Sequence, residues 1–482
     1  MVFSSLLFLY AFLPLSLLCY CLCRSLKAKN VVLLIFSLIF YAWGEPRYVF
    51  LLMFMALADW FAARQIDRAQ SEGVRKLWLT VAVAVDLGLI GFFKYAGFVC
   101  SLFGQPPEFI ARIALPIGIS FYTFQLLTYV IDVYRREVPA QKRYFDILLY
   151  AALFHQCIAG PIVRYQSIAD ELYVERSGRA ELTAGIRRFT VGLAKKTLLA
   201  NPCGALADTL LLEPGVASAA AQFGDNLSFL QHQTVLGAWL GMAAFMLQIY
   251  LDFSAYSDMA IGLGQMLGLH YPENFNYPYT ARSVTEFWRR WHISLSSFFR
   301  DYVYIPLGGS RCSRGRNIFN LFVVWALTGL WHGASWNFVL WGLYFFVFLM
   351  IEKLFLLKGL EKSRVLSRIY LVLVVYIGWI IFHFTDARLG WTVFTDLFAR
   401  SGNALSDFTT QTLLENNLFL LIAGVVACTP LVKRIGEKLD QTLEGVGLWR
   451  VTRNVILPVA LLLLSTCSLV GESYNPFIYF QF

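Results

Sequence analysis

The sequence predicts an all-α, polytopic membrane protein, and its composition is the first reason. Hydrophobic residues make up 58% of the 482 residues and charged residues only 15%, whereas soluble domains have about 45–50% and about 25%. The second reason is that the apolar residues form long runs, many close to the roughly 20 residues that cross a bilayer as a helix. Such a chain has more apolar residues than one soluble core needs and too few polar ones for intrinsic disorder.

Apolar segments along the whole chain are candidates for these membrane helices, and we expect about 11–13 of them to be embedded. Several are short, so they are expected to tilt, re-enter or lie behind other helices, where irregular backbone is tolerated. Scattered charges predict an amphipathic interfacial stretch at 164–200. The whole chain, 1–482, is expected to be one integral-membrane domain with its catalytic core in 281–340. The segments are 3–22, 30–43, 48–64, 78–99, 112–132, 145–163, 235–251, 254–269, 317–333, 335–351, 367–384, 417–431 and 454–470.

The charges in the loops orient the helices, because Lys and Arg collect on the cytoplasmic side of a membrane. The stretch 281–316 holds seven Arg against two acids, whereas 385–416 holds four acids against two Arg. The loops 24–29 and 135–143 are positive as well. We therefore place these two loops and 281–316 in the cytoplasm, and 385–416 outside. The N-terminus and the tail from Gly471 are then also outside.

Several other classes of protein are excluded or disfavoured. Cytoplasmic loops rich in Lys and Arg explain the net charge of +9, so no nucleic-acid partner is expected. The nine Cys residues include no CxxC pair, so we expect neither a metal centre nor a disulfide scaffold. The first apolar run follows no basic region and ends at no clear cleavage site, so we expect it to stay in the protein. No internal repeat is visible, which weakens an inverted-repeat transporter.

His332 is the histidine with the deepest predicted burial of the six. It follows the apolar run Leu321–Leu330, and no Asp, Glu, Lys or Arg lies between Arg316 and Glu352. An ionisable side chain in such a place is costly and is therefore a functional candidate. Desolvation should keep its imidazole neutral, which suits a general base that takes a proton from a hydroxyl. The alternative is a His that only hydrogen-bonds a neighbouring helix, as we assume for His383.

His292 lies in a segment that predicts an amphipathic helix. Ser283 is the predicted N-cap, because Glu286 three residues later completes a capping box. The adjacent Arg289 and Arg290 would form a basic mouth for an anionic donor such as coenzyme A, since Arg contacts phosphate through two hydrogen bonds. The alternative is an interfacial helix with an aromatic belt. The apolar residues at helical spacing, expected against the bilayer or the core, are Trp288, Trp291, Leu295 and Phe299.

Two further features have ordinary explanations beside functional ones. Gly308 and Gly309 follow Pro306 and predict a turn, although backbone N–H groups there could also cradle a phosphate. Asp252 and Asp258 are acids in or near the membrane, as a proton or cation path would need. The alternative to such a path is a structural role, in which the two acids break the helix and fix contacts with Ser or Tyr side chains.

The blocks around these residues resemble one known family. Thr285–Ser296 reads TEFWRRWHISLS, Phe299–Gly309 reads FRDYVYIPLGG, and Leu330–Ala334 reads LWHGA. They resemble the membrane-bound O-acyltransferases, and within them the bacterial alginate O-acetyltransferase branch. One departure is His155, at a position where the family commonly has Pro. Shorter matches run in order along nearly the whole chain, at 1–5, 40–43, 115–122, 158–162 and 475–480.

The resemblance implies a bundle of helices around a central tunnel and an acyl-transfer reaction. The family's essential histidine maps onto His332, and a polar position that other branches fill with Asn or Asp maps onto His292. His332 would then take the proton of a hydroxyl beside an acyl thioester, and His292 would orient the donor. Trp331 and Asn337 are candidates to stabilise the developing oxyanion. The remaining candidate substrate-binding residues are Trp288, Arg289 and Arg290.

The resemblance further implies a bacterial inner-membrane acetyltransferase. It would take acetyl from a cytoplasmic donor, expected to be acetyl-CoA, without a permanently bound cofactor, and move it across the membrane for O-acetylation of an exported polysaccharide such as alginate. Expected partners are the lipid bilayer, a periplasmic or surface-anchored acetyltransferase and the polysaccharide synthesis machinery. Two alternatives within the family are D-alanyl transfer to teichoic acid and peptidoglycan O-acetylation. A third, from another class, is a transporter of acyl groups, lipids or sugars.

Overall fold

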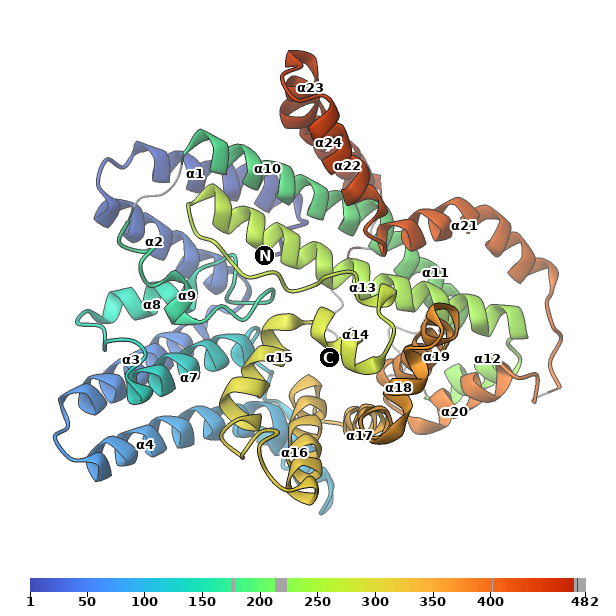
Figure 1. Cartoon of the computed structure of the whole chain (residues 1–482), viewed down its shortest axis with the longest axis horizontal. Helices are drawn as coiled ribbons and strands as arrows, with labels where there is room; N and C mark the ends of the chain where they lie inside the picture. The colour runs from blue at the N-terminus through green and yellow to red at the C-terminus, as the bar shows by residue number, and fades with distance from the viewer. Residues whose placement is uncertain (175–177, 213–222, 401, 472–474, 476–482) are drawn as a thin grey trace. The chain divides into compact units, whose positions relative to one another are not determined.

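The structure is a computed structural model in which helices are the regular elements of the described residues (Figure 1). The prediction of an all-α protein is therefore confirmed. The described residues are 1–174, 178–212, 223–400, 402–471 and 475. Glu175 and Arg176 of the predicted amphipathic stretch lie outside them, as do residues 476–480 of the closing motif.

Eight helical stretches in the described part of the chain are long and apolar enough to cross a membrane, which confirms a polytopic membrane protein. A shorter apolar stretch, Phe8–Leu22, precedes them. The eight are α2 (Leu26–Gly44), α3 (Val49–Arg68), α4 (Glu72–Ile90) with η2 (Gly91–Tyr95) and α5 (Ala96–Ser101), α13 (Val235–Met266), α17 (Trp336–Ile351) with η6 (Glu352–Leu356) and α18 (Leu357–Leu360), α19 (Arg364–His383), α21 (Phe408–Ala427), and α23 (Gly447–Val451) with η7 (Thr452–Ile456) and α24 (Leu457–Gly471).

Shorter helices fill the rest of the described chain. Two segments that the sequence predicts separately, 235–251 and 254–269, form the single helix α13, so the predicted break near Asp252 is wrong. The helix α16 (Arg314–His332) is as long as α2. The shorter helices are η1 (Phe8–Phe12), α1 (Leu13–Leu22), α6 (Glu108–Ala111), α7 (Ile119–Arg135), α8 (Tyr144–Ala152), α9 (Tyr165–Ile168), α10 (Arg179–Ala194), η3 (Lys195–Ala200), α11 (Asn201–Leu211), α12 (Phe223–Gln231), η4 (Pro278–Thr280), α14 (Val284–Arg290), α15 (Ile293–Phe299), η5 (Arg300–Tyr304), α20 (Ala387–Asp396) and α22 (Leu431–Thr442).

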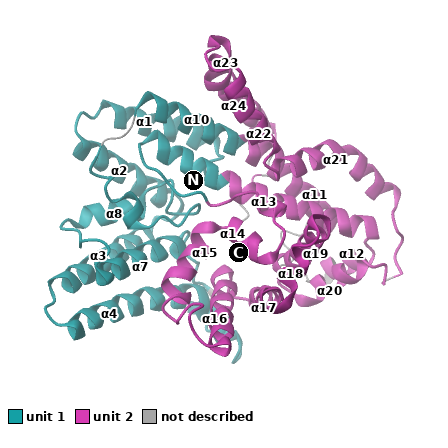
Figure 2. Ribbon diagram, viewed as in Figure 1, with its two compact units in different colours: residues 1–193, 256–273 teal, residues 194–255, 274–482 magenta. Residues whose placement is uncertain are grey.

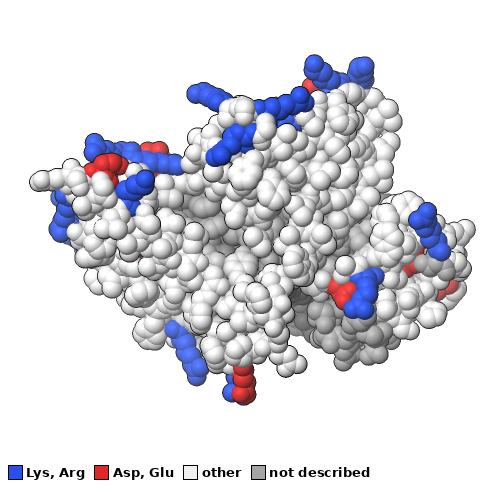
Figure 3. All heavy atoms as spheres, turned by 90° about the horizontal axis from the view of Figure 1, so that it is seen from below, with Lys and Arg blue, Asp and Glu red and all other residues white. Residues whose placement is uncertain are grey.

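Hydroxyl and carboxyl side chains begin several of the long helices. Ser25 Oγ accepts a hydrogen bond from the N–H of Ala28 at 3.2 Å at the start of α2. Asp407 and Thr410 form a complete capping box at the start of α21. Such caps satisfy N–H groups that have no partner inside the helix. In Figure 3 the Lys and Arg side chains gather at the margins of the face shown, and much of the surface between them carries no charged side chain, as lipid contact requires.

The chain divides into two compact units (Figure 2). The first is 1–193 with 256–273, and the second is 194–255 with 274–482. The helix α13 contributes residues to both. The expectation of a single functional domain stays a prediction, and the candidate catalytic core, 281–340, lies in the second unit.

A buried stretch without regular helix is the distinctive feature of the first unit. The helix α8 ends at Ala152, and every residue in 153–163 is buried. The candidate membrane helix at 145–163 therefore ends at Ala152, and the rest of the segment is irregular backbone held inside protein, as the sequence allows for some of the short segments. Gly118, with φ +77°, is needed beside it, because a Cβ there would lie 2.4 Å from the carbonyl oxygen of Cys157. A hydrogen bond of 2.6 Å joins Nδ1 of His155, in this stretch, and the hydroxyl of Tyr271.

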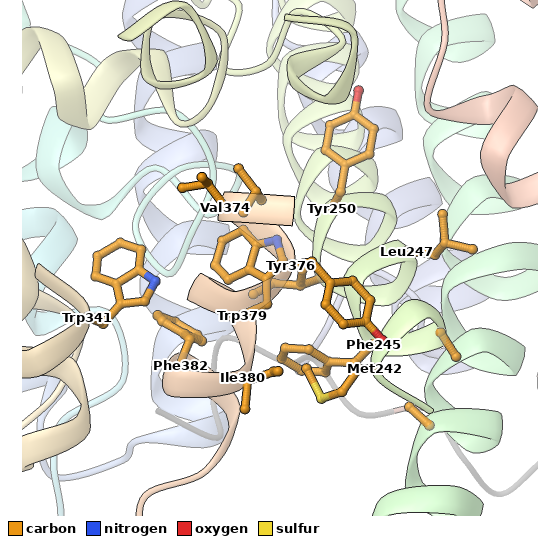
Figure 4. Close-up of a cluster of buried hydrophobic side chains, with 14 of the residues drawn as sticks. Met242, Phe245, Leu247, Tyr250, Trp341, Val374, Tyr376, Trp379, Ile380 and Phe382 are labelled. Carbon is orange, nitrogen blue, oxygen red and sulfur yellow. The ribbon is translucent and has the colours of Figure 1, made fainter. Parts of the chain in front are cut away.

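The helices α16 and α17 of the second unit form a tight hairpin. Its helices meet at two glycines: a Cβ on Gly329 would lie 2.4 Å from the carbonyl oxygen of Phe338, and one on Gly342 would lie 2.5 Å from that of Trp325. Close approach of this kind is typical of membrane helices that pack through small residues. Aromatic side chains cover the hairpin, and Figure 4 shows Trp379 and Phe382 of α19 lying near Trp341 of α17.

Candidate active site

His292 lies at a break between α14 and α15, and not inside one helix as the sequence predicts. Its backbone is left-handed, with φ 44° and ψ 55°, a conformation that non-glycine residues seldom adopt. The predicted N-cap is confirmed, since Ser283 Oγ accepts a hydrogen bond from the N–H of Glu286 at 3.0 Å. The carboxylate of Glu286 accepts from the N–H of Arg282 rather than completing the box. The four apolar residues do lie in the core, because all are buried: Trp288, Trp291, Leu295 and Phe299.

Asn274 orients the imidazole of His292. Its Oδ1 accepts hydrogen bonds from His292 Nδ1 at 3.2 Å, from Ser294 Oγ at 2.9 Å and from the N–H of Ser294 at 3.3 Å. This arrangement places the proton of His292 on Nδ1 and makes Nε2 an acceptor. Nε2 is buried and has no hydrogen-bond partner among the described residues. Burial lowers the pKa of the His292 imidazole to about 3, so the ring is neutral at neutral pH.

His332 is the last residue of α16, at the tip of the hairpin. Its ring centroid lies 4.9 Å from that of Trp341, 5.3 Å from Phe382 and 6.4 Å from Phe338. The side chain is partly exposed, so the prediction that His332 is the most buried histidine is wrong. The reason is its place at a helix end, whereas His292 is held inside the core. Aromatic walls with partial exposure let a substrate approach the ring while much of the water is excluded.

Trp331 separates the two histidines. Its ring centroid lies 5.6 Å from that of His292 and 5.0 Å from that of His332. The indole is 4% exposed. The structure therefore brings together three residues from two sequence blocks about 40 positions apart, in the compact arrangement that a reaction centre needs.

Asn337 links two helices through hydrogen bonds to the backbone, and it makes no hydrogen bond to either imidazole in the described part of the chain. Its Nδ2 donates hydrogen bonds to the backbone carbonyls of Phe382 at 3.1 Å and Ile381 at 3.4 Å, and its Oδ1 accepts one from Ser335. These bonds tie the start of α17 to the end of α19. Both N–H groups of the amide are thus engaged in the structure, and they fix Phe382 against His332.

The other three candidate residues are spread over two environments. Trp288 is buried in an aromatic cluster, where it packs against Trp325, Trp341 and Phe345. Arg289 is exposed. Arg290 forms an ion pair with Glu286 and a hydrogen bond to Thr280 Oγ1 at 3.2 Å. Arg290 therefore lines a separate cleft of the second unit, which neither His292 nor His332 lines.

Glu352 is a buried residue that supports the candidate site and that the sequence does not single out. It is 1% exposed, and its carboxylate accepts hydrogen bonds from the N–H of Val284 at 2.6 Å and from the N–H and hydroxyl of Thr285 at 2.9 and 2.7 Å. It thus anchors the start of α14, the helix that leads to His292. Its signal in the sequence is an acid directly after an apolar run, which is costly unless the acid has partners. Asn274 could not be singled out from the sequence, because no motif around it indicates its contact with His292, 18 residues later.

The geometry suits proton transfer at a hydroxyl. Two imidazoles flank one indole, one of them has a free acceptor nitrogen, and aromatic side chains limit water. A base in such surroundings can remove a proton from a weakly nucleophilic hydroxyl. In the described part of the chain no three His, Cys, Asp or Glu side chains gather as metal ligands would. The expectation of a reaction without metal stays a prediction.

Comparison with known proteins agrees with this chemistry. The model of the membrane-bound O-acyltransferase family matches residues 136–394, more than half of the chain. The chain belongs to this family. The acyltransferase is 35% identical to the probable alginate O-acetylase of Azotobacter vinelandii over the full length of both proteins. It is 39% identical to the probable alginate O-acetylase of Pseudomonas aeruginosa, over 86% of this chain and 78% of the relative.

A relative with another acceptor is also similar. The acyltransferase is 31% identical to the peptidoglycan O-acetyltransferase of Helicobacter pylori, over 82% of this chain and 77% of the relative. Family membership makes the chain an acyltransferase and a multi-pass membrane protein, and the predicted resemblance is confirmed. The alternative of a non-enzymatic transporter is thereby set aside. Both catalytic candidates, His292 and His332, lie within the matched residues.

Proposed function

We propose that this acyltransferase moves acetyl groups from a cytoplasmic donor, acetyl-CoA, across the bacterial inner membrane for O-acetylation of an exported polysaccharide such as alginate. The observation that carries the proposal is the arrangement of His292, Trp331 and His332. The names and extent of the similar alginate O-acetylases support the choice of polymer. The donor reaches the site through a central tunnel, and a periplasmic or surface-anchored acetyltransferase and the polysaccharide synthesis machinery are the partners on the outer side.

In this proposal His332 is the base of the transfer step. Its imidazole takes the proton of the acceptor hydroxyl as the oxygen attacks the acetyl carbon of the thioester. A carbon–oxygen bond forms and the carbon–sulfur bond breaks. The thiolate of coenzyme A leaves and recovers the proton from His332, so the histidine returns to its starting state. The acceptor nitrogen of His292 accepts a hydrogen bond from the donor, and Trp331 fixes the spacing between the two imidazoles.

Vesicles of known orientation test the proposed direction of transfer. Purified protein is inserted into sealed vesicles with its cytoplasmic face outward, the candidate partner and a hydroxyl-bearing alginate oligosaccharide are enclosed, and labelled acetyl-CoA is added outside. We expect label on the enclosed partner or oligosaccharide, and none when the acetyl-CoA is enclosed instead. Equal labelling from both sides, or none from either, would contradict the proposal.

Peptidoglycan O-acetylation is the second candidate, because a relative of that name aligns over most of the chain. Offering peptidoglycan fragments and alginate oligosaccharides in the same vesicles distinguishes the two. D-alanyl transfer to teichoic acid is the third, and labelled D-alanine on its carrier tests it in the same way.

A further inference from the structure

Two acidic side chains face each other inside the membrane-spanning helices of the first unit. Asp59 lies in the middle of α3 and Asp86 in the middle of the stretch Glu72–Ser101, and the two residues are 1% and 0% exposed. Their carboxyl groups are in hydrogen-bonding contact with each other. Neither accepts a hydrogen bond from a backbone N–H or from a hydroxyl, amide or cationic side chain in the described part of the chain. A buried carboxyl group in a membrane is costly, which makes the pair a candidate site.

This carboxyl pair holds a ligand of positive charge. Two ionised carboxylates in contact would repel each other in surroundings that stabilise neither charge. A hydrogen bond between two carboxyl groups needs a proton on one of them, because an ionised carboxylate only accepts. No third His, Cys, Asp or Glu of the described residues joins the pair as a metal ligand would. A proton is therefore the ligand that fits the contact between Asp59 and Asp86.

The helix α7 presents polar side chains to the pair. The helices α3, α4 and α7 pack against one another (Figure 1). Tyr122 is within electrostatic range of Asp86, and Tyr129 is within that of Asp59. Gln125 lies between the two tyrosines on the same face of α7, because residues three or four positions apart share a face. Its buried amide has no hydrogen-bond partner among the described residues, and an amide can donate to a carboxylate or accept from a carboxylic acid.

The other titratable groups around the pair belong to all the helices packed on it. The tyrosines of α2 and α8 among them donate their hydroxyl hydrogens to backbone carbonyls. The arginine among them is within electrostatic range of Tyr129. These groups are Arg64 of α3, Asp132 of α7, Lys94 of η2, Tyr41 of α2, and Tyr144 and Tyr150 of α8.

A cleft of about 420 Å³ lies at one end of the same three helices. Each helix lines it with a residue two or three turns away from its buried polar residue, and therefore on the same face. The line along which the three helices meet thus runs from the cleft to the carboxyl pair, over about 10–16 Å of helix. The spacings are 7 positions from Asp59 to Ile66, 11 from Arg75 to Asp86, and 11 from Tyr122 to Val133.

The cleft is on the side of the membrane that the sequence predicts to be cytoplasmic. Its walls include 136–139, which belong to the basic loop 135–143. Between the cleft and the pair, α7 carries the hydroxyl of Tyr129 and the buried carboxyl of Asp132 on its polar face. Side chains of these types pass protons along chains inside membrane proteins.

We propose that Asp59 and Asp86 form a proton-binding site in the membrane, which exchanges its proton with the cytoplasm through this cleft. Uptake forms an O–H bond on one carboxyl group, release restores the carboxylate, and water in the cleft supplies and removes the proton. The site lies in the first unit, whereas His292 and His332 lie in the second, so the inference does not depend on the proposed function. Each exchange changes the charge among α3, α4 and α7 by one unit, which makes the first unit responsive to cytoplasmic pH.

Infrared spectroscopy of the full chain in nanodiscs tests for the bound proton. A protonated carboxyl group has its own carbonyl stretching band, which shifts in D2O when the proton exchanges. We expect this band in the wild type at neutral pH, its shift in D2O, and its loss in the variant that carries both Asp59→Asn and Asp86→Asn. The matched control is Glu108→Gln, an exposed acid of the same unit, which should keep the band.

Carbodiimide labelling in sealed vesicles tests the ligand and the route. Dicyclohexylcarbodiimide reacts with protonated carboxyl groups inside membranes, and peptide mass spectrometry locates the label. The vesicles hold the wild type with its cytoplasmic face outward. We expect label on Asp59 or Asp86, less label when the outer pH is raised, and no change when only the inner pH is raised.

Four results would overturn the inference. The first is an identical carbonyl band in the wild type and the double variant, and the second is a band that does not shift in D2O, which would make the pair a closed structural contact. The third is protection from the label by Na⁺ or K⁺ at constant pH, which would assign the site to an alkali cation. The fourth is labelling that responds only to the inner pH. The last three use the wild type alone, so they decide the matter even if the double variant does not fold.

Discussion

Replacing Glu352 should loosen the candidate site without touching either histidine. In the variant Glu352→Ala, two backbone N–H groups and one hydroxyl lose the buried carboxylate that accepts their hydrogen bonds. An unsatisfied buried donor costs about 1–3 kcal/mol, so three of them should cost roughly 3–6 kcal/mol when partial relaxation is included. Because the affected residues begin α14, the break that positions His292 should also become less ordered.

Thermal unfolding of the purified protein measures this loss. At about 2 °C for each kcal/mol, we expect the apparent Tm of Glu352→Ala to fall by about 6–12 °C. Thr285→Val removes only the hydroxyl donor and should cost about 1 kcal/mol. Glu361→Gln changes an exposed acid a few residues along and serves as the control. An unchanged Tm for Glu352→Ala, beside an unchanged control, would refute the anchoring role.

Three further substitutions test other parts of the structure. Asp252→Asn should cost about 3–5 kcal/mol, because it leaves the buried ammonium of Lys196 without the carboxylate 2.9 Å away; adding Lys196→Met should recover most of the loss in Tm, and failure to recover would contradict the pairing. As the pH falls from 6.5 to 5, the free energy of unfolding of the wild type should fall by up to about 2 kcal/mol more than that of His292→Asn. The reason is the lowered pKa of His292, because of which the folded state binds fewer protons than the unfolded state. An equal change in Tm for both proteins between pH 7.5 and 5 would exclude this. Gly342→Ala should separate α16 from α17 and cost about 1–3 kcal/mol, whereas Gly315→Ala, with open space around it, should leave the Tm unchanged or raise it slightly.

The membrane helices could be predicted from the sequence, and His332 could be selected from it as a candidate, because both inferences depend on a local property. A run of apolar residues must become a helix in lipid, and a histidine inside such a run is costly unless it is used. Burial itself was less predictable: His332 is at a hairpin tip and partly exposed, whereas His292, beside two arginines in the sequence, is 1% exposed.

The remaining features depend on contacts between distant positions. The helical spacing of Trp288 to Phe299 gives no hint of a break, since the left-handed His292 is held by Asn274, 18 residues earlier. Asp252 suggests a helix break, yet Lys196 neutralises it inside the core. Glu352 resembles the ordinary charged end of a span until its bonds to α14 are known.

The most direct test of the account is the rate of acetyl transfer by His332→Ala in a single turnover. Protein in nanodiscs is saturated with labelled acetyl-CoA, the acceptor is added, and transfer is compared with the wild type and with His232→Ala, an exposed histidine outside the site. A general base contributes about 10²–10⁴-fold, so we expect a loss of that size with unchanged Tm and unchanged affinity for coenzyme A. A folded His332→Ala protein that transfers acetyl at the wild-type rate would contradict the account.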